Sequence, residues 1–194
     1  MKRLLLASAV AVGTMLGMAG QASAACGTVS VAEMNWASAQ LMANVDKIIL
    51  ESGYGCNVEL VPGDPLPTGP SMIEKGEPDI APELWTNGLG PLLKPAVEEG
   101  RIASAGESIA GGAIESLWIP KYMLDAHPEL ATIDGVIANP QLFPDPEDPS
   151  KGALYGCPAG WNCQITTHQL FKAGDMANKG WNLIDPGSGA GLAG

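Results

Sequence analysis

With 194 residues, the chain is long enough for one full domain or two small lobes, and its 21 Asp and Glu outnumber 10 Lys and Arg. A surface with a formal charge of −11 repels nucleic acid and anionic lipid headgroups, so we expect neither as a partner.

The first 24 residues are predicted to be a secretory signal peptide. Lys2 and Arg3 precede an apolar run over 4–18, and Ala22-Ser23-Ala24 has the small-residue pattern of a cleavage site. The apolar run is short for a membrane span and contains glycines. We therefore expect an exported protein that loses residues 1–24.

Four cysteines suit an oxidising compartment and allow three disulfide pairings. Sequence proximity favours Cys157–Cys163, which leaves Cys26–Cys56 in front of two predicted strands that would lie side by side. The rival interpretation is a zinc site made by Cys157, Cys163 and His168. Their spacing matches no common zinc motif, so we expect no metal.

The first half of the chain predicts strands that alternate with helices, the pattern of an α/β fold with a parallel sheet. A helix is predicted to end at Gly53, with Leu41, Met42, Val45, Ile48 and Ile49 on one face. The other predicted elements are strands over 28–33, 57–61 and 79–84, a Pro/Gly loop over 62–70, and helices over 71–75 and 91–100.

The second half continues the pattern after Gly111-Gly112, where we expect the chain to cross from one lobe to another. Strands are predicted over 101–107, 113–119, 152–155 and 181–185, helices over 121–126, 132–139 and 164–173, and loops over 145–148 and 186–194. Prolines break the ligand spacing of a calcium loop at 145–148, so this segment is expected to be structural. The last predicted strand has no helix after it, so we expect an incomplete second lobe.

Tryptophans mark the expected binding site, because ligands of parallel sheets lie beyond the C-terminal ends of the strands. Trp36 and Trp85 follow two predicted strands. Trp161 lies in a small loop between Cys157 and Cys163, just before a predicted helix. The start of a helix offers free N–H groups to an anion, and an aromatic face holds a cation, so this arrangement suits a small zwitterion.

No enzyme motif is present. The chain has no G-x-S-x-G, H-E-x-x-H, phosphate loop or dinucleotide fingerprint, and the two histidines, His127 and His168, have no evident nucleophile nearby. We expect a protein that is not an enzyme and needs no cofactor. A secreted structural or interaction domain remains the alternative.

Four stretches resemble the periplasmic substrate-binding proteins of ABC importers for glycine betaine, proline betaine or choline. They are V-A-E-M-N-W (31–36), G-E-P-D-I-A-P-E-L-W (76–85), G-A-I-E-S-L-W-I-P-K (112–121) and G-C-P-A-G-W-N-C-Q-I-T-T-H-Q-L (156–170). The resemblance implies a type II-like fold with lobe I at 25–112 and a partial lobe II at 113–194. Since family members run on past this point, it also implies a C-terminally truncated chain.

The resemblance further implies a box of aromatic faces around a quaternary ammonium group, formed by Trp36, Trp85 and Trp161. Trp118 is a weaker candidate, and Trp181 is expected in the core. Backbone N–H groups near Asn162 and Cys163 would hold a carboxylate.

Choline, which has no carboxylate, would need a hydroxyl acceptor such as Glu33 or Glu83. The expected partners are the quaternary ammonium ligand and a membrane permease with its ATPase, with the protein a monomer in the periplasm.

Overall fold

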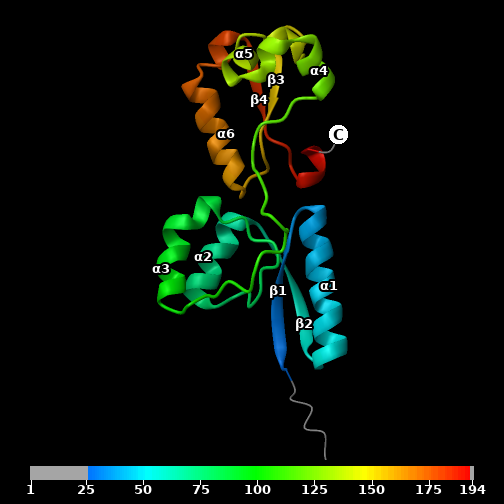
Figure 1. Cartoon of the computed structure of the whole chain (residues 1–194), viewed down its shortest axis with the longest axis vertical. Helices are drawn as coiled ribbons and strands as arrows, with labels where there is room; N and C mark the ends of the chain where they lie inside the picture. The colour runs from blue at the N-terminus through cyan, green and yellow to red at the C-terminus, as the bar shows by residue number, and fades with distance from the viewer. Residues whose placement is uncertain (1–25, 193–194) are drawn as a thin grey trace, which may run out of the picture.

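The computed structural model describes residues 26–192, so the predicted signal peptide lies outside the described residues. The described chain is a mixed α/β structure with two separate two-stranded parallel sheets. Figure 1 shows the elements in two groups that one extended segment links, with the start of α6 next to the N-terminal group. None of the described helices is long and apolar enough to cross a membrane.

The N-terminal group is built around the pairing of β1 with β2, which runs in register from Thr28–Asn57 to Met34–Gly63. Its elements are β1 (Thr28–Met34), α1 (Ala37–Tyr54), β2 (Asn57–Gly63), α2 (Pro65–Lys75), the 3-10 turn η1 (Asn87–Leu89) and α3 (Gly90–Glu98). Val31, Ala32 and Met34 of β1 are fully buried, and Ala39 and Ala43 of α1 pack against this strand.

The C-terminal group is built around β3 and β4, which also pair in parallel. Its elements are α4 (Lys121–Ala126), η2 (Pro128–Ala131), α5 (Ile133–Ile137), η3 (Pro140–Leu142), β3 (Gly152–Tyr155), α6 (Asn162–Ala173), η4 (Ala177–Lys179), β4 (Trp181–Ile184) and η5 (Gly189–Leu192). Trp181 is 2% exposed and donates its ring N–H to the Ile137 carbonyl at 3.0 Å. The expectation that Trp181 belongs to the core is confirmed.

The predicted loop over 62–70 is wrong except at Asp64, because β2 runs to Gly63 and α2 already begins at Pro65. Pro65 and Pro67 lie in the first turn, where no backbone N–H is needed for the helix ladder. Only Pro70 removes a donor inside the helix. The prolines of this segment indicate a loop from sequence alone, although Pro65 and Pro67 lie at helix positions that tolerate proline.

Three predicted strands are absent from the described structure. Of 79–84, only Ile80 forms a single bridge, to Val31, and the Asp79 carboxylate accepts bonds from the Ser30 amide and hydroxyl at 2.7 and 2.6 Å. The segments 101–107 and 113–119 have no strand partner. A strand forms only where it can pair with the edge of another strand, and alternation of apolar and polar residues does not provide that partner.

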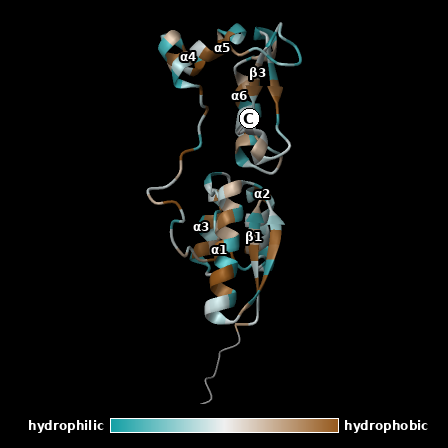
Figure 2. Cartoon of the chain, turned by 90° about the vertical axis from the view of Figure 1, so that its right-hand side faces the viewer, coloured by the Kyte–Doolittle hydropathy of each residue, from teal (hydrophilic) through white to brown (hydrophobic). Residues whose placement is uncertain are grey.

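The apolar face predicted for α1 is largely exposed. Leu41 and Ile48 are 66% and 63% exposed, and Val45 and Ile49 are also exposed, whereas the buried positions are the two alanines. Figure 2 looks onto α1 and shows apolar residues along its length. The narrow two-stranded sheet covers only the alanine side of this helix.

Both predicted disulfides, Cys26–Cys56 and Cys157–Cys163, are present, and no free cysteine remains. The second bridge excludes the zinc alternative, because both thiols are consumed and His168 instead pairs with Asp185 at 2.6 Å.

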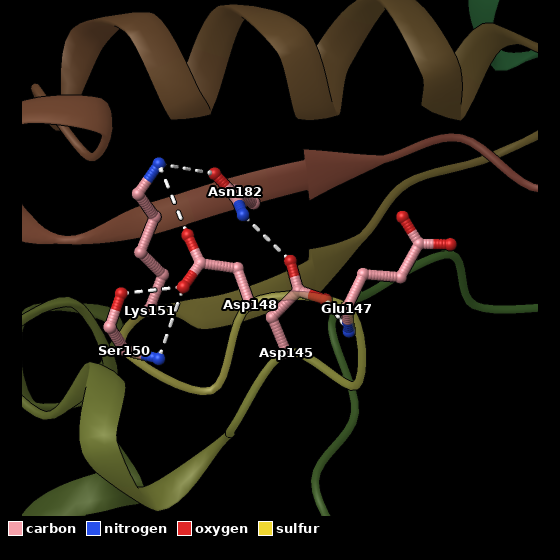
Figure 3. A network of polar contacts seen from close by, with 6 residues as sticks. All are labelled: Asp145, Glu147, Asp148, Ser150, Lys151 and Asn182. Carbon is pink, nitrogen blue, oxygen red and sulfur yellow. Dashed lines mark hydrogen bonds and ion pairs between the residues drawn. The ribbon is translucent and has the colours of Figure 1, made fainter.

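The acidic loop over 145–148 forms a polar network with β4, as Figure 3 shows. Asp145 is buried and accepts hydrogen bonds from the Asn182 amide at 2.7 Å and the Glu147 backbone at 2.8 Å. These bonds hold the pKa of Asp145 below its usual value, and the bond from Asn182 has the largest effect. The carboxylate fastens the loop to the sheet.

Candidate functional site

The cavity of about 220 Å³ that contains the predicted tryptophans lies where the two groups of elements meet. Its lining comes from both groups and from the connecting segment: Trp36, Ser38, Pro65, Glu83, Trp85, Asn87, Glu115, Trp161, Asn162 and Cys163. No short piece of the chain makes this cavity alone.

Glu83 fixes the orientation of two tryptophans in the N-terminal group. Its Oε1 accepts the ring N–H of Trp36 at 2.8 Å and that of Trp85 at 3.0 Å. Glu83 lies three residues after the bridge at Ile80, and Trp36 lies two residues after the end of β1. One buried carboxyl group thereby links the chain after β1 to the chain after the Ile80 bridge.

Trp161 is held from outside its own group. Its ring N–H donates to Asn35 Oδ1 at 2.8 Å and to Asp64 Oδ1 at 3.1 Å. Gly160 has φ of 90°, a conformation that glycine tolerates best, and its carbonyl accepts the Leu66 N–H of α2 at 3.1 Å. The loop before α6 is therefore bonded to the residue that follows β1 and to the start of α2.

The rings of Trp36 and Trp161 meet edge to face, with centroids 5.0 Å apart and planes at 76°. All three indole N–H groups in the cavity already donate to protein oxygens. Each ring can therefore offer a ligand mainly its π face and its edge carbons. Two nearly perpendicular faces make a corner that suits a rounded cationic group.

The N-terminus of α6 also opens onto the cavity through Asn162 and Cys163. No side chain caps this helix end, and within the described residues neither amide donates a hydrogen bond. Free N–H groups and the positive end of the helix dipole attract a negative group.

Acidic groups dominate the electrostatics of the site. Glu83 and Glu115 line the cavity, and no Lys, Arg or His is among its lining residues in the described chain. Behind Trp161, burial raises the pKa of the Asp64 carboxyl, and the hydrogen bond from Trp161 opposes this rise.

Five of the six residues predicted for ligand binding line this one cavity, namely Trp36, Trp85, Trp161, Asn162 and Cys163. Trp118 is not brought to it; this residue is 80% exposed on the connecting segment. Of the two acceptors considered for choline, Glu83 lines the cavity, whereas Glu33 accepts from Asn44 at 3.0 Å and does not.

Sequence reasoning missed the residues that hold Trp161 and cover it. Asn35 precedes Trp36, and Asp64 precedes a helix whose first half was predicted to be a loop. A Cβ on Gly189 of η5 would lie 2.9 Å from the Trp36 Cβ and 3.2 Å from Cη2 of Trp161. Only the Asp-Pro step at 64–65, a usual helix start, could have signalled one of them.

Within residues 26–192, no cluster of three or more His, Cys, Asp or Glu has an arrangement that would hold a metal ion. The site has the features of a cavity that binds a small charged molecule between aromatic faces.

Comparison with known families identifies the class of proteins to which this chain belongs. Residues 27–194 match the model of the substrate-binding domain of ABC-type glycine betaine transport systems. The chain belongs to that family, whose members bind substrates and are not enzymes in general. No curated protein matched the chain.

Proposed function

We propose that this protein is the solute-binding component of an ABC importer and captures a quaternary ammonium osmolyte in the tryptophan-lined cavity. Glycine betaine, proline betaine and choline are the candidate ligands. The observation that carries this proposal is that Trp36, Trp85 and Trp161, from segments far apart in sequence, line one cavity.

The physics of the ligand agrees with this lining. A trimethylammonium group cannot donate a hydrogen bond from nitrogen, and its charge is spread over a large, weakly hydrated surface. Aromatic faces bind such a cation by cation–π attraction and apolar contact, worth about 2 kcal/mol when desolvated. Because the indole N–H groups are already bonded, the rings interact with the ligand through their faces.

A betaine would place its carboxylate at the start of α6, where the amides of Asn162 and Cys163 are available. The ammonium group would contact Trp36 and Trp85 of the N-terminal group, and Trp161 and the α6 amides of the C-terminal group would complete the site, so one ligand would bridge the two groups.

Transport requires that the ligand be enclosed and then released. We assign the two groups of elements to lobes, 25–112 and 113–194, that close on the ligand. The crossing contains Gly111 and Gly112, whose φ values of 80° and 78° favour glycine and mark a position for a hinge. The closed form would dock as a monomer on a permease coupled to an ATPase, in the periplasm. The two disulfides are consistent with export.

Titration of intrinsic tryptophan fluorescence tests this function. A saturable change with glycine betaine, proline betaine or choline supports it, since ligand would contact the rings directly. If all three ligands leave the spectrum unchanged and equilibrium dialysis detects no bound ligand, the alternative holds: a secreted structural domain or a fragment that does not bind.

A further inference from the structure

Two glycines lie at the junction, the place beside the cavity where the N-terminal and C-terminal groups of elements touch. Gly88 belongs to η1 of the N-terminal group and lies against Asn162, the first residue of α6. Gly189 belongs to η5 of the C-terminal group and lies against Trp36 of the N-terminal group. Each group therefore presents bare backbone to a cavity-lining residue of the other group.

The space at both glycines is too small for a methyl group. A Cβ on Gly88 would lie 2.6 Å from Cγ and 2.9 Å from Cβ of Asn162. A Cβ on Gly189 would lie 2.9 Å from the Trp36 Cβ and 3.2 Å from Cη2 of Trp161. Carbon atoms pack best at about 3.5–4.0 Å, so either methyl group would overlap atoms of the opposite group.

The atoms opposite these glycines are not free to move aside. The Cβ atoms of Asn162 and Trp36 are attached directly to the backbone, so a different side-chain rotamer leaves them in place. The chain before Trp36 is also bonded across the junction, because the Trp161 ring N–H donates to Asn35 Oδ1 at 2.8 Å. A methyl group at either glycine must therefore push the two groups of elements apart.

Backbone conformation does not require glycine at either position. Gly88 and Gly189 lack the positive φ that favours glycine, whereas Gly160 has φ of 90°. An alanine at these two positions would therefore meet a shortage of space and no backbone strain.

We propose that Gly88 and Gly189 set how closely the two groups of elements approach, and thereby how tightly the cavity encloses its ligand. This inference rests on the proposed function and assigns two positions that control closure at its site. Cation–π attraction needs ring centroids within about 6 Å of the cation. A side chain at either glycine would leave each tryptophan on its own group but hold Trp161 too far from Trp36 to enclose one cation with it.

Two matched pairs of alanine variants test this inference. Gly88→Ala and Gly189→Ala place a methyl group at the junction. Gly90→Ala and Gly187→Ala, each two residues away, place it where no atom of the described chain lies within 4 Å. None of the four glycines has a positive φ, so the substitutions differ in the space they need and not in backbone strain. Calorimetric titration of the full chain with choline, glycine betaine and proline betaine measures Kd.

We expect Kd to rise about 10-fold in Gly88→Ala and in Gly189→Ala and to stay within about 2-fold of wild type in the two controls. Forcing a methyl group into a packed contact commonly weakens it by about the larger factor. The double variant Gly88→Ala/Gly189→Ala should bind nearly as well as the weaker single variant, because one methyl group already prevents full closure. Two independent local defects would instead multiply, to about 100-fold.

The outcomes separate this inference from the proposed function. If the wild-type chain binds a probe and both junction variants bind it as tightly as their controls, the inference is wrong and the proposed function stands. Equal losses of affinity within a matched pair, or losses that multiply in the double variant, also overturn the inference. If no probe binds the wild-type chain, both are wrong. Where circular dichroism shows that one junction variant does not fold, the other matched pair decides.

Discussion

At the scale of single residues, hydrogen bonds to the indole N–H groups decide what the tryptophans can do. Trp36 and Trp85 share the Oε1 atom of Glu83, and Trp161 is held by Asn35 and Asp64. Rings fixed in this way need no reordering when ligand arrives, which lowers the entropy cost of binding.

Replacement of Trp85 or Trp161 by alanine should weaken ligand binding strongly. Each variant loses one aromatic face worth about 2 kcal/mol, which corresponds to about a 30-fold rise in Kd. Calorimetric titration with the tightest-binding quaternary ammonium compound measures this change. Trp118→Ala is the matched control, because Trp118 is exposed and does not line the cavity. An equal loss of affinity in Trp118→Ala would contradict the assignment of the cavity.

Asp64→Asn should change how stability depends on pH. Burial raises the pKa of the Asp64 carboxyl in the folded state, so its favourable contribution is complete below the ordinary aspartate pKa of about 4 and is lost as pH rises through the raised value. Asparagine keeps an acceptor for Trp161 without this ionisation. Urea unfolding should therefore show that the variant gains stability relative to wild type between pH 3.5 and about pH 7. An unchanged difference across this window would refute the argument.

At the scale of elements, the two disulfides have separate tasks. Cys26–Cys56 ties the starts of β1 and β2 and spans 30 residues, whereas Cys157–Cys163 spans 6 and encloses the loop with Trp161. Chain-entropy arguments assign about 3.5 kcal/mol of stability to the longer closure and about 2.5 kcal/mol to the shorter one.

Paired Cys→Ser variants should separate stability from binding. Loss of the Cys26–Cys56 bridge should lower the free energy of unfolding by about 3.5 kcal/mol with Kd nearly unchanged. Loss of the Cys157–Cys163 bridge should raise Kd by about 10-fold, because Trp161 and the start of α6 lose their fixed geometry. Denaturant unfolding and calorimetric titration measure the two effects. Unchanged ligand affinity without the short bridge would show that it plays no part in the site.

Sequence patterns predicted the elements that have strong local signals. β1, β2, β3, β4 and the long helices α1 and α6 were expected within a few residues of where they lie. The predictions were wrong where a strand depends on a pairing partner, as at 101–107 and 113–119. They were also wrong where proline starts a helix, as at Pro65.

The candidate site was predictable only in part for the same reason. Trp36 and Trp85 stood out because each follows a predicted strand, and Trp161 because it lies in a small loop just before a predicted helix. Asn35 and Asp64 act through contacts 126 and 97 residues away in sequence, which no local pattern reports.

At the scale of the whole molecule, the cavity depends on two groups of elements held together by few contacts. Trp161, Gly160 and the connecting segment with Glu115 supply much of this junction. In Figure 1 the last turn of the chain also lies between the two groups. A ligand that contacts both groups should stabilise the closed arrangement, since it binds that arrangement better.

Ligand should therefore make the molecule more compact. Small-angle X-ray scattering should show a smaller radius of gyration at saturating ligand than without it. Replacement of Gly111 and Gly112 by alanine strains both positive-φ positions and should reduce this change. An identical radius of gyration with and without ligand would contradict closure and leave a preformed cavity.

The most direct test of the central claim is a crystal structure of the protein grown with a quaternary ammonium ligand at saturating concentration. The ligand nitrogen should lie within about 6 Å of the ring centroids of Trp36, Trp85 and Trp161, the range of cation–π contact. A ligand bound elsewhere on the molecule, with this cavity empty, would contradict the account.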